Sequence, residues 1–284
     1  MARRDEIVAF ADELLEVETF PEYGRPGLQV VGPEDVSRLA CGVSSSRELF
    51  ERAAAAAAEL VLVHHGLFWR NEPLVVDRRL KGRLEALFAG NLTLVAYHLA
   101  LDAHPELGNN ALLADRLGAQ REEAFAGIGA GARFAEPITI RELAERLRKA
   151  TGREPLVFSE GPERIERVAV VTGGGGTRLI EAAHEGYDAL VTGEPEEPAL
   201  HTARELSIHF LAGGHYATET FGVQALAARL VPLQQMSSGF SPAITRRATA
   251  SSVAPIATAI GAPCVLVSLG ARDREARQHS LKGH

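Results

Sequence analysis

The sequence predicts an α/β fold with two α/β domains, each of which carries a mainly parallel sheet. Short apolar strands alternate with segments of helical spacing, a pattern typical of parallel sheets with helices on their faces. This alternation occurs at 38–97 and again at 165–230. The chain has 284 residues, of which 46% are hydrophobic and 24% are charged, so its size and composition fit two globular domains.

Local spacing predicts the individual elements in chain order. Helices are expected over 5–15, from a cap at 44–46 to residue 59, and over 77–88, 110–117, 140–150, 177–184, 198–206 and 218–230. Strands are expected over 38–43, 60–63, 92–97, 165–171, 189–191 and 208–211, with a further candidate at 265–269. The stretch 21–33 is rich in turn residues.

The chain is expected to divide into three parts. Residues 1–120 form a first α/β domain and residues 121–230 form a second α/β segment. Residues 231–284 are rich in Ser, Ala, Pro and Arg and lose the periodicity, so this tail is expected to be divergent and loosely ordered. The abrupt change also motivates the hypothesis of a frame-altered end, which re-sequencing of the gene would test.

Composition narrows the classes of partner and the compartment. The net charge of −7 argues against a nucleic acid or a membrane, because both bind clustered Lys and Arg. The N-terminus lacks a signal peptide, and no segment has the roughly 20 apolar residues that span a bilayer. Cys41 and Cys264 lie in apolar runs, as buried free thiols do. A cytoplasmic protein is therefore expected.

Histidines and carboxylates follow the predicted strands. His64 and His65 come directly after the apolar run LVLV, and Asp102 follows the strand at 92–97. His215 and Glu219 follow the strand at 208–211, at a spacing of four that places them on one face of a helix. Ligands collect at the carboxyl ends of strands in parallel sheets, so these side chains are expected to converge.

Each of these fragments also has a purely structural interpretation. The imidazoles could simply finish a strand, Asp102 could cap a helix, and Glu219 could complement a helix dipole. Together, three histidines and two carboxylates exceed the four ligands of a structural zinc site. They suit two divalent metal ions per chain, with Zn, Fe, Mn, Co and Ni all compatible with the ligand types.

Two further side chains are candidates for proton transfer. His98 lies four residues before Asp102 and could be a ligand, orient a ligand or move a proton. Glu194, in LVTGEP, ends another predicted strand. The run VAVVTGGGGTRL at 168–179 could bind a substrate anion through backbone amides, but crowding at a tight turn explains its glycines equally well.

These motifs resemble the NIF3-like family, also called the GTP cyclohydrolase 1 type 2 homologue family. The resemblance rests on GLQVVG, LVLVHHGLFW, YHLALDAHPELGNN, LVTGEP and GGHYATETFGVQALA, and covers about residues 1–230. It implies an NIF3-like fold of two interlinked α/β domains, a dinuclear metal centre and a toroidal homohexamer. The ligands that it implies are His64 and His65 from HHG, Asp102 from LALD, and His215 and Glu219 from HYATE.

The chain departs from the family pattern in two places. Ser44 stands where many members have Asp, so the site is expected to lose an outer contact there. After Leu230 the tail differs from the strand that usually ends the family's chains. The ligands all precede this change, so the metal site is expected to be retained.

Three functions are compatible with these observations. The first is a metal-dependent hydrolase of a small phosphorylated or nucleotide-like substrate, with His98 or Glu194 moving a proton. The family name suggests GTP, but nothing in the sequence indicates guanine recognition. The alternative is a metal-binding scaffold or regulator that binds a protein partner without turnover. In a third interpretation the metals only join the two domains.

Overall fold

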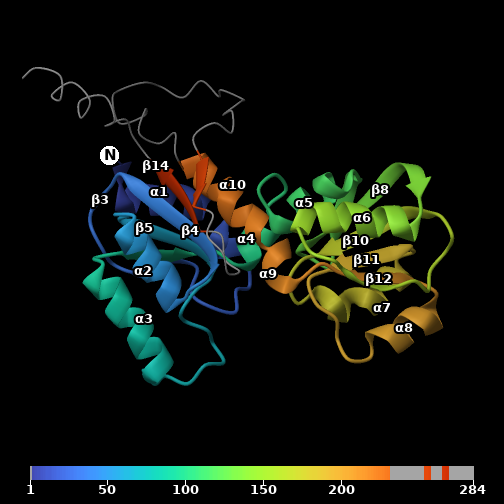
Figure 1. The fold of residues 1–284 in the computed structure, drawn as a ribbon, viewed down its shortest axis with the longest axis horizontal. Coiled ribbons are helices and arrows are strands. Elements are labelled where there is room, and N and C mark those ends of the chain that lie inside the picture. Colours follow the sequence, from blue (N-terminus) through green and yellow to red (C-terminus); the bar gives the residue numbers. More distant parts are fainter. Residues whose placement is uncertain (1, 231–252, 257–263, 269–284) are drawn as a thin grey trace, which may run out of the picture. The chain divides into compact units, whose positions relative to one another are not determined.

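The computed structural model describes residues 2–230, 253–256 and 264–268, which form two compact α/β units (Figure 1). Unit 1 consists of Met1–Leu14, Tyr23–Ala96 and Leu226–His284, and unit 2 of Leu15–Glu22 and Tyr97–Ala225. Because each unit contains separate stretches of the chain, the expected interlinking of the two α/β parts is confirmed.

Unit 1 contains a six-stranded sheet with the order β13-β14-β4-β5-β6-β2. Its strands are β2 (Gly27–Val30), β4 (Arg38–Ser44), β5 (Leu60–His65), β6 (Thr93–Ala96), β13 (Val253–Ile256) and β14 (Cys264–Ser268). The central strands β4, β5 and β6 are parallel, whereas the outer pairs are antiparallel. A separate two-stranded sheet pairs β1 (Ala2–Arg3) with β3 (Asp35–Val36).

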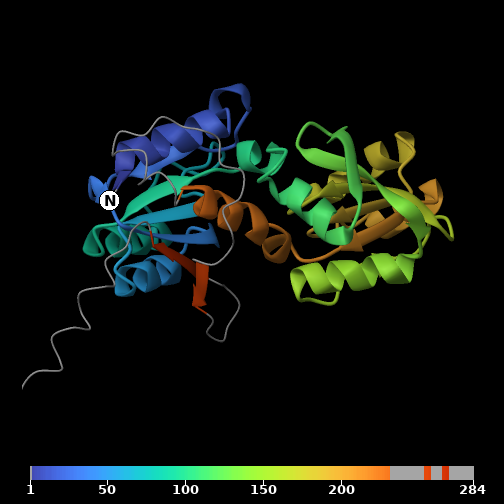
Figure 2. The ribbon, with the colours of Figure 1, turned by 90° about the horizontal axis from the view of Figure 1, so that it is seen from above.

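Helices cover both faces of this sheet. Figure 2 shows α1 (Arg4–Leu14) on one side and α2 (Arg47–Ala55) with α3 (Arg78–Ala89) on the other. Phe50 of α2 and Leu87 of α3 are fully buried in one core with Val61 and Val63 of β5. The predicted cap of α2 is confirmed, because the side chain of Ser46 accepts a hydrogen bond from the amide of Leu49 at 3.1 Å.

Unit 2 contains a second six-stranded sheet, with the order β7-β8-β10-β11-β12-β9. Its strands are β7 (Gln120–Phe125), β8 (Gly129–Ile138), β9 (Leu156–Phe158), β10 (Ile165–Val171), β11 (Ala189–Thr192) and β12 (His209–Ala212). Again the three central strands, β10, β11 and β12, are parallel, and the outer pairs are antiparallel.

Alternate side chains of these central strands enter two cores. On one face, α5 (Asn109–Leu117) and α6 (Ile140–Thr151) pack over Val168 and Val170, and on the other α7 (Leu179–His184) and α8 (Ala199–Leu206) pack over Ala169 and Val171 (Figure 1). The remaining helices are α4 (Leu99–Ala103), α9 (His215–Thr218), α10 (Thr220–Leu230) and the 3-10 helices η1 (Val17–Thr19) and η2 (Gly175–Arg178). This layering explains why the strands are continuous apolar runs.

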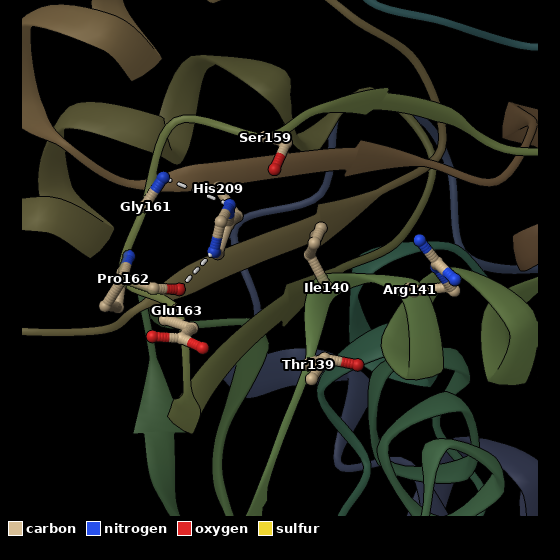
Figure 3. Close-up of a pocket in the computed structure, with 8 residues that line it drawn as sticks. All are labelled: Thr139, Ile140, Arg141, Ser159, Gly161, Pro162, Glu163 and His209. Atoms are coloured by element: carbon tan, nitrogen blue, oxygen red, sulfur yellow. Dashed lines mark hydrogen bonds between the residues drawn. The ribbon is translucent and has the colours of Figure 1, made fainter.

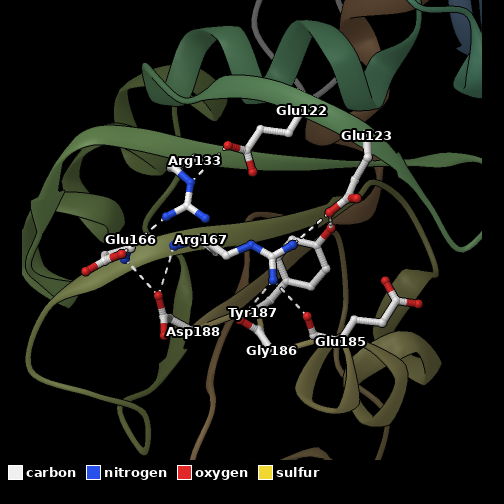
Figure 4. Close-up of polar contacts among 9 residues, drawn as sticks. All are labelled: Glu122, Glu123, Arg133, Glu166, Arg167, Glu185, Gly186, Tyr187 and Asp188. Atoms are coloured by element: carbon white, nitrogen blue, oxygen red, sulfur yellow. Dashed lines mark hydrogen bonds and ion pairs between the residues drawn. The ribbon is translucent and has the colours of Figure 1, made fainter.

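A polar network crosses the antiparallel side of this sheet (Figure 4). The guanidinium of Arg167 lies 4.3 Å from the ring centroid of Tyr187, and both side chains contact Glu123, at 2.7 and 2.8 Å respectively. Arg133 contacts Glu122 at 2.9 Å and Glu166 at 3.2 Å. These contacts connect β7, β8 and β10, although each exposed ion pair contributes only about 0–1 kcal/mol.

The predicted α/β class and the parallel strands are confirmed. The longer stretch of unit 2 begins at Tyr97, and α5 within it buries Leu113 and Leu117 in the core that contains β8 and β10. The sequence pattern does not predict α4, β2, β7, β8 or β9. In β7 all residues before Phe125 are exposed, so it lacks the apolar run that marks a central strand.

Part of the expectation for the tail can be compared with the structure. The strand expected at 265–269 is present as β14. The other expectations for residues 231–284, and that for the thiol of Cys264, lie outside the described residues, whereas Cys41 is a buried free cysteine. Among the helices described, none combines the length and apolarity needed to cross a membrane.

Candidate metal centre

Unit 1 supplies two candidate ligands at the end of β5. His64 is fully buried and His65 is partly exposed, and their ring centroids are 4.8 Å apart with a 42° tilt. Ser44 pairs with His65 across β4 and β5, and its Oγ lies 3.4 Å from Nδ1 of His65. The Ser44 hydroxyl is thus within reach of Nδ1 of His65, and the expected loss of the outer contact that a carboxylate would make there stays a prediction.

Gly66 has a different role from the backbone freedom suggested by the sequence. Its φ is outside the left-handed region, and a Cβ at this position would overlap the side-chain amide of Gln29. Gln29 accepts a hydrogen bond from the amide of Leu67 and donates one to the carbonyl of Arg25, each at 2.7 Å. Gly66 thus lets Gln29 hold the chain where it leaves β5.

Unit 2 brings together the predicted pair His215 and Glu219. α9 begins at His215, and Glu219 follows its last residue, so Nε2 of His215 lies 3.3 Å from Oε2 of Glu219. The other ring nitrogen, Nδ1, lies 3.1 Å from Oε1 of Glu194. The contact with Glu219 raises the pKa of His215 to about 9, with help from Glu194 and against the effect of burial. A proton thus provides positive charge between two carboxylates.

The glycine run after β10 lies against this pair. Gly173 has a φ of 62°, and a Cβ there would overlap Oε1 of Glu219 and lie 3.2 Å from Nε2 of His215. The amide of Gly173 donates a hydrogen bond to Oγ1 of Thr218 at 3.1 Å. Close approach to the ligand pair therefore explains this glycine. The helices that follow, η2 and α7, have four and six residues, and anion binding by the backbone amides of this run stays a prediction.

Asp102 lies in α4 and is 5% exposed. Its Oδ1 accepts a hydrogen bond from Nδ2 of Asn109 at 2.8 Å, and its carbonyl accepts one from Nδ2 of Asn110 at 3.2 Å. Oδ1 of Asn110 in turn accepts the amide of Thr172, at the end of β10, at 2.7 Å. The sequence pattern did not indicate these asparagines, although they end the segment YHLALDAHPELGNN that contains Asp102.

His98 precedes α4 and contacts a carboxylate that the sequence pattern does not predict. Its Nδ1 lies 3.5 Å from Oε2 of Glu22, which is 5% exposed and also accepts the amide of Ala100 at 2.9 Å. Burial opposes ionisation of Glu22, but hydrogen bonds from His98 and from the amides of Ala100 and Leu99 outweigh it and lower the pKa. Glu22 is thus an anion that orients His98.

The described chain carries histidine and carboxylate groups that could hold a metal ion. The residues of these groups are His64, His65, His98, Asp102, His215 and Glu219. Glu194 is not among these groups and instead contacts His215. Imidazole and carboxylate donors fit a divalent transition metal.

A pocket elsewhere in unit 2 has a different character (Figure 3). It is lined by Thr139, Ile140, Arg141, Ser159, Gly161, Pro162, Glu163 and His209. Nδ1 of His209 accepts the amide of Gly161 at 3.0 Å, and its Nε2 lies 2.8 Å from the carbonyl of Pro162 and donates to it. His209 therefore connects backbone segments, with both ring nitrogens used.

Comparisons with known proteins show the family of this chain. A family model for Duf34/NIF3 (NGG1p interacting factor 3) matches residues 2–245. A Yersinia pestis protein called GTP cyclohydrolase 1 type 2 homolog is 40% identical over 239 residues, which cover 84% of this chain and 97% of the relative. An Escherichia coli K12 protein of the same name is 40% identical over 226 residues, covering 79% and 92%.

Two solved structures are similar throughout most of their length. Protein ybgI, described as of unknown function, has a TM-score of 0.78 and 40% identity, and the match covers 80% of this chain and 93% of that protein. TTHA1606 from Thermus thermophilus has a TM-score of 0.76 and 38% identity, with coverage of 81% and 93%.

Proposed function

The chain belongs to the Duf34/NIF3 family, and from this premise we propose that it binds two divalent metal ions and acts as a metal-dependent hydrolase. The proposed ligands are His64, His65, Asp102, His215 and Glu219. The proposed substrate is a small phosphorylated or nucleotide-like molecule. The name shared by the relatives makes GTP the first compound to test.

The main support for this proposal comes from the contacts of His215. Its ring lies between the buried carboxylate of Glu219 and the carboxylate of Glu194, at 3.3 and 3.1 Å. Histidine ligands of metals commonly donate their second ring N–H to a carboxylate, which fixes the ring and makes it a better donor. With Nδ1 bound to Glu194, Nε2 of His215 and the carboxylate of Glu219 present a matched pair of donors to a cation.

The chemistry follows from the roles of these side chains. Bound divalent ions would lower the pKa of water and stabilise negative charge on a substrate oxygen. Glu194 would keep a proton on Nδ1 of His215 and could accept one at its exposed carboxylate. Glu22 holds Nδ1 of His98, so Nε2 of His98 could take up or release a proton. His98 and Glu194 are therefore the proposed proton carriers.

The test combines metal analysis with turnover. Protein purified without added metal should contain about two ions per chain by elemental analysis, and the loaded protein should hydrolyse a member of a panel of nucleotides and phosphate esters. Glu219→Ala should lose both metal and turnover, whereas Glu197→Ala, which removes an exposed glutamate, should keep both. Absence of metal from the wild type, or unchanged turnover in Glu219→Ala, would eliminate the proposal.

A second candidate function is a metal-binding scaffold or regulator that binds a protein. It is favoured by three consecutive exposed apolar side chains between β5 and α3: Leu74 (105% exposed), Val75 (65%) and Val76 (59%). Contiguous apolar surface of this kind marks interaction sites. The scaffold function is favoured over the hydrolase if two results are obtained together. Replacing these residues by serine abolishes partner capture, and the wild type consumes no compound in the hydrolase panel.

We also propose, from the family resemblance, that the chain assembles into a homohexamer. Native mass spectrometry of the purified protein would show a sixfold mass if this holds. A monomer at micromolar concentration would refute it.

A further inference from the structure

We propose that Asn109 is a positioning residue of the metal centre, which fixes the carboxylate of Asp102 relative to the segment that carries Glu219. The inference rests on the proposed function and deepens it. It concerns contacts within unit 2 alone.

The orientation of the Asn109 amide follows from its partners. Its side chain is fully buried, and its Oδ1 accepts the backbone amide of Gly222 at 2.7 Å. A backbone N–H can only donate, so the oxygen of the amide must face Gly222. Nδ2 is therefore at the other end, where it donates to Oδ1 of Asp102 at 2.8 Å. A flipped amide would place two donors against each other at Gly222.

Gly222 lies three residues after Glu219, which carries the second proposed carboxylate ligand of unit 2. It is the third residue of α10, which begins at Thr220 directly after Glu219. A Cβ at Gly222 would lie 3.0 Å from Oδ1 of Asn109, tighter than an ordinary contact, so glycine permits this close approach. One buried amide thus contacts Asp102 directly and the helix start that follows Glu219.

The frame around Asn109 is itself closely packed. Asn109 is the first residue of α5, and a Cβ at the preceding Gly108 would overlap backbone carbonyls of α4, including that of Asp102. Asn110 holds the same carbonyl of Asp102 at 3.2 Å. The main chain of Asp102 is therefore fixed by its neighbours, and Asn109 holds Oδ1 of its side chain.

The hydrogen bond from Asn109 to Asp102 would orient a metal ligand, in addition to filling space in the core. Side chains that hydrogen-bond a metal ligand hold it in its binding orientation, and their loss typically weakens metal binding by about 10–100-fold. The carboxylate of Asp102 is held through one oxygen by a neutral donor. An aliphatic side chain of similar size would fill the volume without holding that oxygen.

The experiment compares Asn109→Ala with a matched control, His209→Ala, in the full chain. Both replacements remove a buried side chain of unit 2 that makes two hydrogen bonds, but His209 contacts Gly161 and Pro162 and no candidate ligand. Metal-free proteins are titrated with Co²⁺ at a temperature where circular dichroism shows each to be folded. The dissociation constant and the visible absorption of bound Co²⁺ are recorded.

We expect Asn109→Ala to bind Co²⁺ about 10–100-fold more weakly and with an altered absorption spectrum, while His209→Ala melts earlier but binds like the wild type. Wild-type binding by Asn109→Ala, or equal loss in both variants, overturns the inference. If Asn109→Ala does not fold, Gly222→Ala displaces the amide more gently, and unchanged affinity there overturns it. A wild type that binds no Co²⁺ instead overturns the proposed function itself.

Discussion

Replacing Gly173 by alanine perturbs the candidate site from the backbone side. Gly173 has a φ of 62°, and the new Cβ would overlap Oε1 of Glu219 while lying 3.2 Å from Nε2 of His215. The neighbouring atoms therefore have to move. We expect Gly173→Ala to displace the carboxylate of Glu219, to weaken metal binding and to lower the free energy of unfolding.

The expected loss of stability in Gly173→Ala has two contributions. A left-handed conformation costs a residue with a Cβ roughly 1–2 kcal/mol. Displacing a buried polar group from its partner costs about 1–3 kcal/mol more. Gly152→Ala isolates the first contribution, because Gly152 has a φ of 71° and a Cβ there would meet no atom within 4 Å. Gly152→Ala should therefore lose only about 1–2 kcal/mol of stability.

Urea unfolding of the metal-free proteins measures the stability difference, and Zn²⁺ titration by calorimetry measures affinity. Gly152→Ala should bind Zn²⁺ like the wild type, and Gly173→Ala should bind it more weakly. If the two variants lose equal stability and both keep wild-type affinity, the close approach of Gly173 to Glu219 has no functional consequence and the reasoning fails.

Substitutions at three further positions test other contacts. Asn110→Ala leaves buried backbone groups without a partner, so urea unfolding should show a loss of about 1–3 kcal/mol for each such group; a loss under about 0.5 kcal/mol would contradict this. Ser44→Asp places a carboxylate beside Nδ1 of His65 and should increase Zn²⁺ affinity measured by calorimetry, whereas Ser44→Ala should decrease it. Glu194→Ala removes the partner of Nδ1 of His215 and should weaken Zn²⁺ binding by about 10–100-fold in the same assay; an unchanged dissociation constant would remove Glu194 from the site.

The parts of the fold that the sequence predicts are those with a local apolar signal. β5 begins with a continuous apolar run, LVLV, because helices cover both faces of its sheet. β7 is an edge strand whose residues before Phe125 are all exposed, so its sequence QREEAF resembles a loop. β2 lies in a stretch rich in turn residues, and its pairing with β6 joins segments more than 60 residues apart. Pairing of this kind leaves no periodic signal in either segment.

The same distinction separates the candidate site residues. His215 and Glu219 lie four residues apart, so their contact is encoded in local spacing. Glu22 contacts the amide of Ala100, 78 residues later, and only the fold brings the two together. Asn109 directly precedes the helix expected at 110–117, a position where an asparagine ordinarily caps the helix. In the structure its side chain contacts Gly222 instead.

The hydrogen bond between Asn109 and Gly222 closes a loop of 113 residues, and this has a consequence for biosynthesis. A ribosome releases Asp102 long before it releases Gly222, and contacts between such distant segments form late because loop closure must precede them. The carboxylates of unit 2 can therefore take their final positions only after α10 has emerged and unit 2 has folded around them. An ion that needs these carboxylates would therefore bind only after unit 2 has folded, so metal binding would follow the folding of this unit rather than guide its early steps.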